Sequence, residues 1–282
     1  MTRCPSASSM ARVAAPIPEA DPLMAMVRTE TPLRCTMIVP VGQTGQMDVT
    51  HRLDRAREDG ERIIDLCLAG PDEAVPACPG WDAAKLLSHI TNVWHMLAIF
   101  GESKPDGFPG RDQFPPAPAT GEEGTAARTA LDRVDAAMRA LEPGVAMWSW
   151  GTTQTSDYFH RRYHLENLVH RVDAEQAAGV ASAIDGDEAA DAVDERFVEF
   201  VHRREERPNG SLHLHRTDGP GEWTVSVVDD RIVVTREHAK GDAAARGTGA
   251  DLMLAMWGRG PVDALEVFGE PSLVGVWFEL CR

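Results

Sequence analysis

Residues 163–173 read YHLENLVHRVD, and the spacing of Glu166 and His170 in this stretch guides the interpretation of the whole chain. A helix turns by about 100° per residue, so these two side chains fall on one stripe together with Tyr163. Such a stripe faces the interior of a helical bundle, while His164 is expected on the opposite, polar side. A buried carboxylate is costly unless it is paired or bound to a cation, so Glu166 needs a partner.

A second predicted helix supplies one further histidine. Residues 82–101 read DAAKLLSHITNVWHMLAIFG, in which His89 borders the apolar face and His95 points to the far side. If the two helices face one another, His89, Glu166 and His170 would offer one oxygen and two nitrogens to a divalent ion. Three protein ligands would leave coordination positions open for water or substrate.

Taken one at a time, these residues have simpler explanations. A Glu and a His four positions apart are most often a hydrogen-bonded pair, and a lone core histidine is most often satisfied by its neighbours. Other histidines are expected at the surface: His160 and His164 on the polar side of their helix, and His213 and His215 on the outer face of one strand. Periodicity alone therefore leaves the metal site, a hydrogen-bonded pair and a purely structural helix open.

The composition excludes several classes of protein. The chain has 282 residues, of which 43% are hydrophobic and 26% charged, and its formal net charge is -16. An acidic surface disfavours general binding to nucleic acids and binding to anionic membranes. An anionic substrate would need a local positive site on the protein. No apolar run approaches the roughly 18 residues of a membrane span, and the N-terminus lacks the features of a signal peptide. We expect a cytoplasmic protein whose five scattered cysteines are reduced.

Hydrophobic periodicity divides the chain into three parts. Residues 1–46 are rich in Pro, Ala, Ser and Thr and are predicted to be a disordered extension. Residues 47–205 are predicted to form a helical bundle, interrupted by a Pro- and Gly-rich loop at 102–124 that is a candidate lid or binding loop. The predicted helices of the bundle cover residues 51–70, 82–101, 125–144, 156–179 and 185–206.

The pattern changes from helical to alternating after Pro208. Residues 211–218, 222–229 and 230–237 alternate apolar and polar side chains and are separated by turn sequences, which predicts an antiparallel sheet. A helix follows within residues 247–260. Residues 206–282 are therefore expected to be a smaller α+β domain, and the fold class of the whole chain is α+β.

The chain lacks the sequence signatures of several common enzymes. It has no H-E-x-x-H motif, no G-x-S-x-G elbow and no Walker A loop. The sequence GTGADL lacks the third glycine of a dinucleotide fingerprint. No cofactor-binding residues are identified from these patterns.

Several stretches resemble a known family. The run VPACPGWDAAKLLSHITNVW at 75–94 is similar to the opening of the mycothiol-dependent maleylpyruvate isomerase family, a branch of the DinB-like metal-binding bundles. HLENLVHRVDAE at 164–175 and DGDEAADAVDERFVEF at 185–200 are similar to two further segments of that family. The stretch from SLHLHRTDGPGEWTV to HAKGDAAARGTGADLMLAMWGR is similar to its C-terminal domain. The resemblance covers about residues 47–270 and implies a DinB-like bundle.

The resemblance implies a divalent metal, usually zinc, with His89, Glu166 and His170 as ligands. It implies mycothiol as a thiol co-substrate, which isomerises a cis enedioate such as maleylpyruvate by reversible thiolate addition, bond rotation and elimination. It also implies an active-site arginine from the second domain, for which Arg246 and Arg259 are the candidates.

We therefore predict a divalent-metal-dependent, mycothiol-linked isomerase or S-transferase that acts on a small molecule, for which an anion is one candidate. Arg162, near the Glu166 face, is a candidate for steering that molecule. The alternative is a non-catalytic metal or small-molecule binding module, which a fourth ligand would favour, and Cys78 is the first residue to test for that role. The sequence does not specify the oligomeric state.

Overall fold

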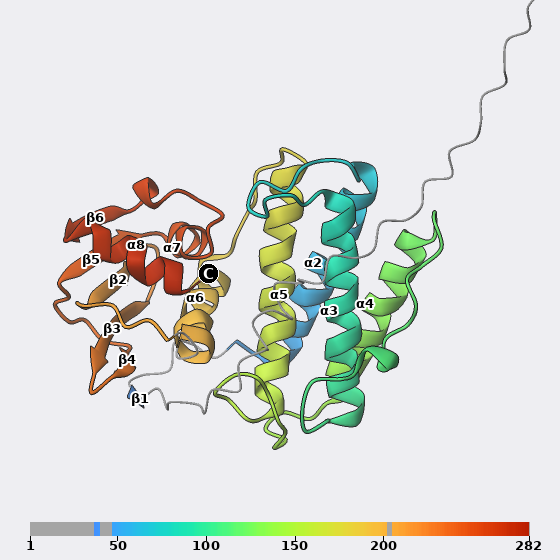
Figure 1. Ribbon diagram of the computed structural model, residues 1–282, viewed down its shortest axis with the longest axis horizontal. Helices are drawn as coiled ribbons and strands as arrows, with labels where there is room; N and C mark the ends of the chain where they lie inside the picture. The colour runs from blue at the N-terminus through green and yellow to red at the C-terminus, as the bar shows by residue number, and fades with distance from the viewer. Residues whose placement is uncertain (1–36, 40–46, 202–204, 282) are drawn as a thin grey trace, which may run out of the picture. The chain divides into compact units, whose positions relative to one another are not determined.

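The computed structural model describes residues 37–39, 47–201 and 205–281, all of which belong to one compact unit. Four long helices form the predicted bundle (Figure 1): α2 (Val49–Ala69), α3 (Ala83–Ser103), α4 (Glu123–Ala140) and α5 (Ser156–Ala177). The side chain of Asp82 caps α3, as the sequence predicts, by accepting a hydrogen bond from the backbone N–H of Lys85. None of the described helices is both long enough and apolar enough to cross a membrane.

Helix α5 is the central helix, and this corrects the prediction of a polar side. His160 and His164, expected in solvent, are 1% and 0% exposed. The Nε2 atom of His160 lies 3.1 Å from the carbonyl oxygen of Met138, and the Nε2 atom of His164 lies 3.5 Å from a carboxylate oxygen of Glu188. The expectation was wrong because α2, α3 and α6 (Gly186–Glu195) surround α5, so that its polar residues pair with partners inside the protein.

Helix α6 continues directly into a π-helical turn, η2 (Arg196–Phe200). The predicted fifth helix, 185–206, is thus helical from Gly186 to Phe200 but changes its winding at Arg196. Residues 202–204 are outside the described residues, and residues 205–206 are not helical. A π turn displaces the side chains that follow it relative to an α-helical register. It places Phe200 beside both Arg162 and Arg196, each of which lies over its ring.

The six-stranded sheet is mixed, whereas the sequence predicted an antiparallel one. Its order is β1-β4-β3-β2-β5-β6, and β2, β3 and β4 are antiparallel as expected. However, β5 is parallel to β2 and β1 is parallel to β4. The strands are β1 (Met37–Val39), β2 (Leu212–Arg216), β3 (Glu222–Val228), β4 (Arg231–Thr235), β5 (Ala243–Gly247) and β6 (Glu266–Gly269).

A short crossover explains the difference. Residues 236–242 do not form a hairpin but run from the end of β4 back to the start of β2, where Asp242 accepts hydrogen bonds from the backbone N–H and the hydroxyl of Ser211. Strand β5 therefore enters beside β2 in the same direction. Strand β1 lies inside the segment predicted to be disordered; the rest of that segment, 1–36 and 40–46, is outside the described residues.

One face of the sheet is covered by α7 (Gly249–Met256) and α8 (Pro271–Leu280). The alternating residues Leu212 and Leu214 are fully buried on this side and belong to a core that also contains Leu165 and Val169 of α5. The bundle and the sheet thus share one hydrophobic core. The domain boundary that the sequence predicts between residues 205 and 206 remains a prediction.

The loop at 102–124 is shorter than predicted because α3 extends to Ser103 and α4 begins at Glu123. It contains a short 3-10 turn, η1 (Arg111–Gln113). Phe108 anchors it, since its ring contacts the rings of Phe100, Trp148 and Trp150. Its proposed role as a lid remains a prediction.

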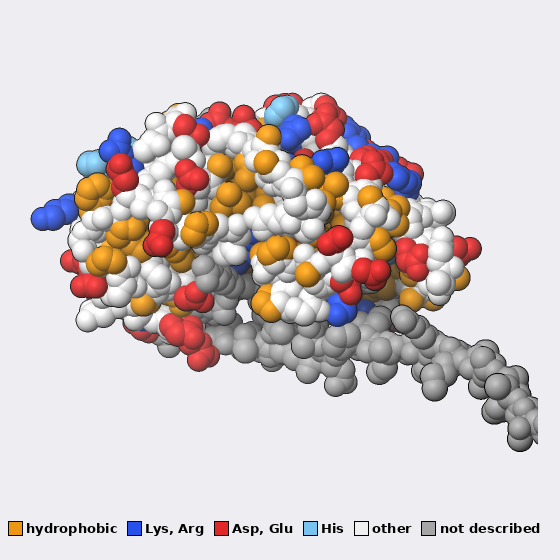
Figure 2. Space-filling view, turned by 90° about the horizontal axis from the view of Figure 1, so that it is seen from above, with side chains coloured by type: hydrophobic (Ala, Val, Ile, Leu, Met, Phe, Trp, Pro, Cys, Tyr) orange, Lys and Arg blue, Asp and Glu red, His pale blue; other side chains and the backbone are white. Residues whose placement is uncertain are grey.

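Several charged side chains at the surface of the bundle form ion pairs between neighbouring helices. Arg128 on α4 bonds to Glu61 and Asp65 on α2, and Arg133 bonds to Glu102 on α3. Figure 2 shows basic and acidic side chains interspersed on one face of the molecule. Such exposed pairs contribute little to stability, about 0–1 kcal/mol each.

Candidate metal centre

Helices α3 and α5 bring together the three residues that the sequence singled out. The Oε1 atom of Glu166 lies 3.2 Å from Nε2 of His170 and 3.9 Å from Nε2 of His89. One ligand atom of each residue lies within 4.8 Å of those of the other two. All three are buried, with exposed fractions of 9%, 7% and 8% for His89, Glu166 and His170.

The chemistry of this cluster fits a divalent ion such as zinc. Two imidazole nitrogens and one carboxylate oxygen are a ligand set that zinc accepts, and a buried carboxylate gains most from a nearby cation. The described residues place no fourth ligand atom within that range of all three. Burial raises the pKa of the Cys78 thiol to about 11, and the sulfur of this candidate for a fourth ligand does not belong to the cluster. A three-residue site keeps positions open for a reactant.

Glu166 is held as a carboxylate by its neighbours. Burial on its own raises the pKa of Glu166, but the positive charge of Arg162 and the hydrogen bonds from His170 and His89 outweigh it and hold this pKa well below its usual range. Arg162 donates to the Oε2 atom at 2.5 Å and also to Glu195. The other oxygen, Oε1, therefore faces the two imidazoles.

Asp173 and Arg259 orient the ring of His170. Its Nδ1 atom lies 2.9 Å from Oδ2 of Asp173, a fully buried carboxylate, and its Nε2 atom lies 3.2 Å from Oε1 of Glu166. When Nδ1 donates its proton to Asp173, the lone pair of Nε2 is available to an ion. Arg259, which follows α7, donates to both oxygens of Asp173, at 2.9 and 2.8 Å. Burial raises the pKa of Asp173, but the bond from His170 and the charge of Arg259 lower it further than burial raises it. Arg259 thus acts on the cluster through Asp173.

The structure separates the two predicted arginines. Arg259 joins the cluster by way of Asp173, and its Nη2 atom also lies 3.8 Å from the sulfur of Cys78. Arg246 lies on β5, where its half-exposed side chain pairs with Glu266 at 3.4 Å. Of the two candidates, only Arg259 is brought to the metal cluster.

We expect Arg259→Ala to weaken zinc binding by about 10–100-fold, because loss of an outer-shell partner of a ligand commonly has this effect. The reason is that Asp173 would lose its guanidinium and hold the His170 ring less firmly. Zinc affinity is measured by competition with a chromophoric chelator. Arg246→Ala is the matched control and should bind zinc as the wild type does; equal affinities for both variants and the wild type would contradict the role of Arg259.

A further arginine was missed by the sequence analysis. Arg196, at the start of the π turn, is 8% exposed and has no carboxylate within 4.0 Å among the described residues. Its guanidinium instead lies over the Trp257 ring at 4.1 Å and over the Phe200 ring at 5.3 Å. Burial, together with the charges of Arg162 and Arg259, lowers its pKa to about 10, so it stays positive at neutral pH. Sequence periodicity gave no signal for it, because the change of winding at η2 decides where it points.

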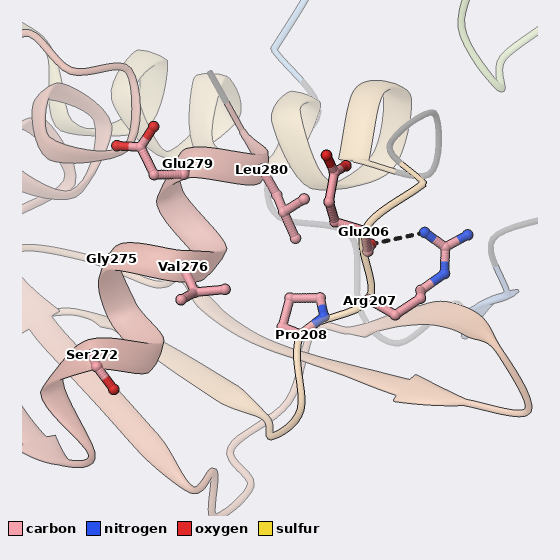
Figure 3. Close-up of a pocket in the computed structure, with 8 residues that line it drawn as sticks. All are labelled: Glu206, Arg207, Pro208, Ser272, Gly275, Val276, Glu279 and Leu280. Atoms are coloured by element: carbon pink, nitrogen blue, oxygen red, sulfur yellow. Dashed lines mark hydrogen bonds between the residues drawn. The ribbon is translucent and has the colours of Figure 1, made fainter.

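A separate pocket of about 530 Å³ lies between α8 and residues 206–208 (Figure 3). Pro208, Val276 and Leu280 give it an apolar wall, with Glu206, Arg207 and Glu279 at its border. None of the residues that line it belongs to the metal cluster. It is therefore not part of the candidate centre.

Comparison with known proteins identifies two family models along the chain and one similar crystal structure. Residues 50–175 match the family model described as mycothiol maleylpyruvate isomerase N-terminal domain, and residues 187–275 match the MDMPI C-terminal domain. A crystal structure of a histidine-to-alanine mutant of mycothiol-dependent maleylpyruvate isomerase is similar over 82% of this chain and 97% of that chain, with a TM-score of 0.56 and 14% sequence identity. No curated protein matches the chain.

The TM-score of 0.56 shows a common fold despite the low identity, and the two family models together cover most of the chain. The α+β fold with a DinB-like helical bundle, predicted from the sequence, is confirmed. The chain belongs to the mycothiol-dependent maleylpyruvate isomerase family.

Proposed function

We propose that this protein is a divalent-metal-dependent isomerase that uses mycothiol and acts on a small, anionic enedioate, with maleylpyruvate as the first candidate. The observation that carries the proposal is the buried cluster of His89, Glu166 and His170, which has no fourth protein ligand among the described residues. A closed structural site would be completed by the protein itself. The family membership adds the expected thiol and substrate class.

In this proposal the three residues hold the metal, and their neighbours fix their orientation. A bound zinc ion would supply Lewis acidity, which favours the thiolate form of a thiol and polarises an oxygen. Asp173, itself held by Arg259, would accept the proton of Nδ1 in a hydrogen bond and leave Nε2 of His170 for the ion. Arg162 neutralises the second oxygen of Glu166, so the carboxylate is not left as an unpaired buried charge.

We place one carboxylate of the substrate at Arg196. The chain has a net charge of -16, so an anion needs a local positive group. Arg162 and Arg259 are already paired with carboxylates, which argues against the earlier idea that Arg162 steers the substrate. Arg196 shares the rings of Phe200 and Trp257 with Arg162, which itself contacts Glu166. This chain of contacts links Arg196 to the metal cluster.

The reaction is balanced without an oxidant or a reductant. The thiolate sulfur bonds to one alkene carbon of the enedioate and a proton is added to the other, which turns the double bond into a single bond. Rotation about this bond is followed by loss of the proton and of the thiolate. The trans isomer and the free thiol are the products.

The test is an assay of the full chain, loaded with zinc, on maleylpyruvate with and without mycothiol. We expect loss of the cis isomer only when the thiol is present, and loss of activity on chelation with recovery after zinc is added. In the same assay Arg196→Leu should raise KM by about 10-fold or more, as expected for a lost bond to a charged group. Its melting temperature should not fall, because an unpaired buried charge is replaced by an apolar side chain.

The products distinguish the remaining alternatives. Net consumption of thiol would indicate an S-transferase at the same site. Tight zinc binding with neither isomerisation nor thiol consumption, for maleylpyruvate and for other mycothiol acceptors, would contradict the proposal and support the non-catalytic binding module.

A further inference from the structure

A second group of histidines converges on one carboxylate, far along the sequence from the first. His213 and His215 lie on β2, Glu222 begins β3, and His238 lies in the crossover that follows β4. We propose that these four residues form a second binding site for a divalent metal ion of the zinc class. This site is independent of the proposed enzymatic function.

The strand register creates the cluster. His215 and Glu222 are direct partners in the antiparallel pair of β2 and β3, and His213 lies two residues along β2 on the same face. Because β3 and β4 form a hairpin in which Thr224 pairs with Thr235, the chain that leaves β4 returns to the start of β3. This brings His238 to Glu222.

All three imidazoles reach the same carboxylate. The Nε2 atom of His213 and the Nδ1 atom of His238 lie 2.7 and 2.8 Å from Oε2 of Glu222. The Nδ1 atom of His215 lies 3.0 Å from Oε1. One ligand atom from each of the four residues lies within 4.8 Å of all the others, as in the first cluster.

The prediction that His213 and His215 are ordinary surface residues is therefore wrong for His213, which is only 6% exposed. Its ring packs 4.9 Å from the ring of His238, which the crossover 236–242 carries over the polar face of the sheet. The alternation of Leu212 and Leu214 with the histidines correctly assigns them to the face opposite the core. What the alternation misses is the crossover above that face.

Three imidazoles and one carboxylate are a complete ligand set for tetrahedral zinc. An imidazole coordinates an ion through the ring nitrogen that carries no proton, so the nitrogens that face Glu222 would bind the ion in the tautomer that has its proton on the other nitrogen. Four protein ligands would fill the coordination positions of a tetrahedral ion and leave none open for a reactant. The ion would fasten β2, β3 and the crossover to one another, which is a structural role, in contrast to the three-residue centre.

The side chain of His238 is 76% exposed and that of His215 is 34% exposed, which gives an ion a path from solvent. The same exposure makes these two residues suitable for substitution, since little packing is lost. His215→Ala/His238→Ala is therefore the test variant. His51→Ala, which removes an exposed histidine at the start of α2, is the matched control.

The experiment uses the full chain without a histidine tag, stripped with a chelator and dialysed against zinc alone before elemental analysis. We expect two zinc ions per chain in the wild type and in His51→Ala, and one in His215→Ala/His238→Ala. Glu166→Ala should also retain one ion, and the triple variant Glu166→Ala/His215→Ala/His238→Ala should retain none. The melting temperature of Glu166→Ala should rise on addition of zinc, and that of the triple variant should not.

These variants separate the two proposals. If His215→Ala/His238→Ala binds as much zinc as the wild type, the second site is refuted whatever happens at Glu166. If only Glu166→Ala keeps the wild-type zinc content, the first centre fails and the second stands. Unchanged melting temperatures in the absence of zinc would show that the substitutions leave the fold intact.

Discussion

Glu166→Ala and His170→Ala are each expected to lose one equivalent of zinc and all thiol-dependent turnover. Each substitution removes one of three ligands from a buried site that the described residues do not complete with a fourth. Outer-shell changes alone cost about 10–100-fold in affinity, so removal of a direct ligand should have a larger effect. Zinc content is measured by elemental analysis of untagged protein, in parallel with turnover of maleylpyruvate and mycothiol.

The control for this result is another buried histidine on the same helix. His160→Gln removes a side chain that bonds to the carbonyl of Met138 and belongs to neither metal cluster, so it should keep its zinc. Glu166→Ala also leaves Arg162 with one carboxylate fewer, and His89→Ala checks the same ion from α3 without that side effect. Full zinc retention by the Glu166, His170 and His89 variants would refute the centre.

The second large effect is expected from Asp194→Asn, which should lower the free energy of unfolding by about 2–4 kcal/mol. Asp194, on α6, is 5% exposed and accepts hydrogen bonds from three places in the chain. Arg161 of α5 donates at 2.9 Å, Trp223 of β3 at 3.1 Å, and Arg236 of the crossover at 2.5 and 2.9 Å. An asparagine at this position removes the carboxylate that pairs with Arg236 and leaves Arg161 with Asp191.

Thermal or denaturant unfolding in a chelating buffer measures this effect free of metal binding. A loss of about 2–4 kcal/mol corresponds to a melting temperature lower by about 4–16 °C in a chain of this size. Asp187→Asn is the matched control on the same helix. It pairs with Arg216, but its side chain is 76% exposed, and the expected change is about 0–1 kcal/mol. Equal changes in the two variants would contradict the role given to Asp194.

The ionisation of Asp194 is also expected to make the free energy of unfolding depend on pH in acid. Burial raises its pKa, but the hydrogen bonds from Arg236 and the charge of Arg161 outweigh burial and lower the pKa from 3.8 to about 2. Since the folded-state pKa lies below that of the unfolded chain, the stabilisation is complete above pH 3.8 and disappears as the pH falls through about 2. It amounts to about 2 kcal/mol, and Asp194→Asn should lose this part of the acid dependence.

Local spacing was sufficient to predict the pair on α5. Glu166 and His170 are one helical turn apart, so any α-helix places them on one stripe. The cap at Asp82 and the apolar periodicity that follows it predicted the helix that carries His89. Spacing was insufficient for His160 and His164, because the polarity of a helix face does not reveal whether another layer covers it. The assignment of Arg259 over Arg246 required the contact with Asp173, which lies 86 positions away along the chain.

The sequence by itself determined the helices of the bundle, the hairpin strands β2 to β4 and the family of the protein, because periodicity, caps and turns act between residues a few positions apart. Only the tertiary structure decided that β5 runs parallel to β2, that α5 is buried on all sides, and that His213, His215 and His238 meet at Glu222. These features depend on contacts between distant segments. The packing and crossing of whole helices and strands determine these contacts, and the local pattern of a sequence does not contain that information.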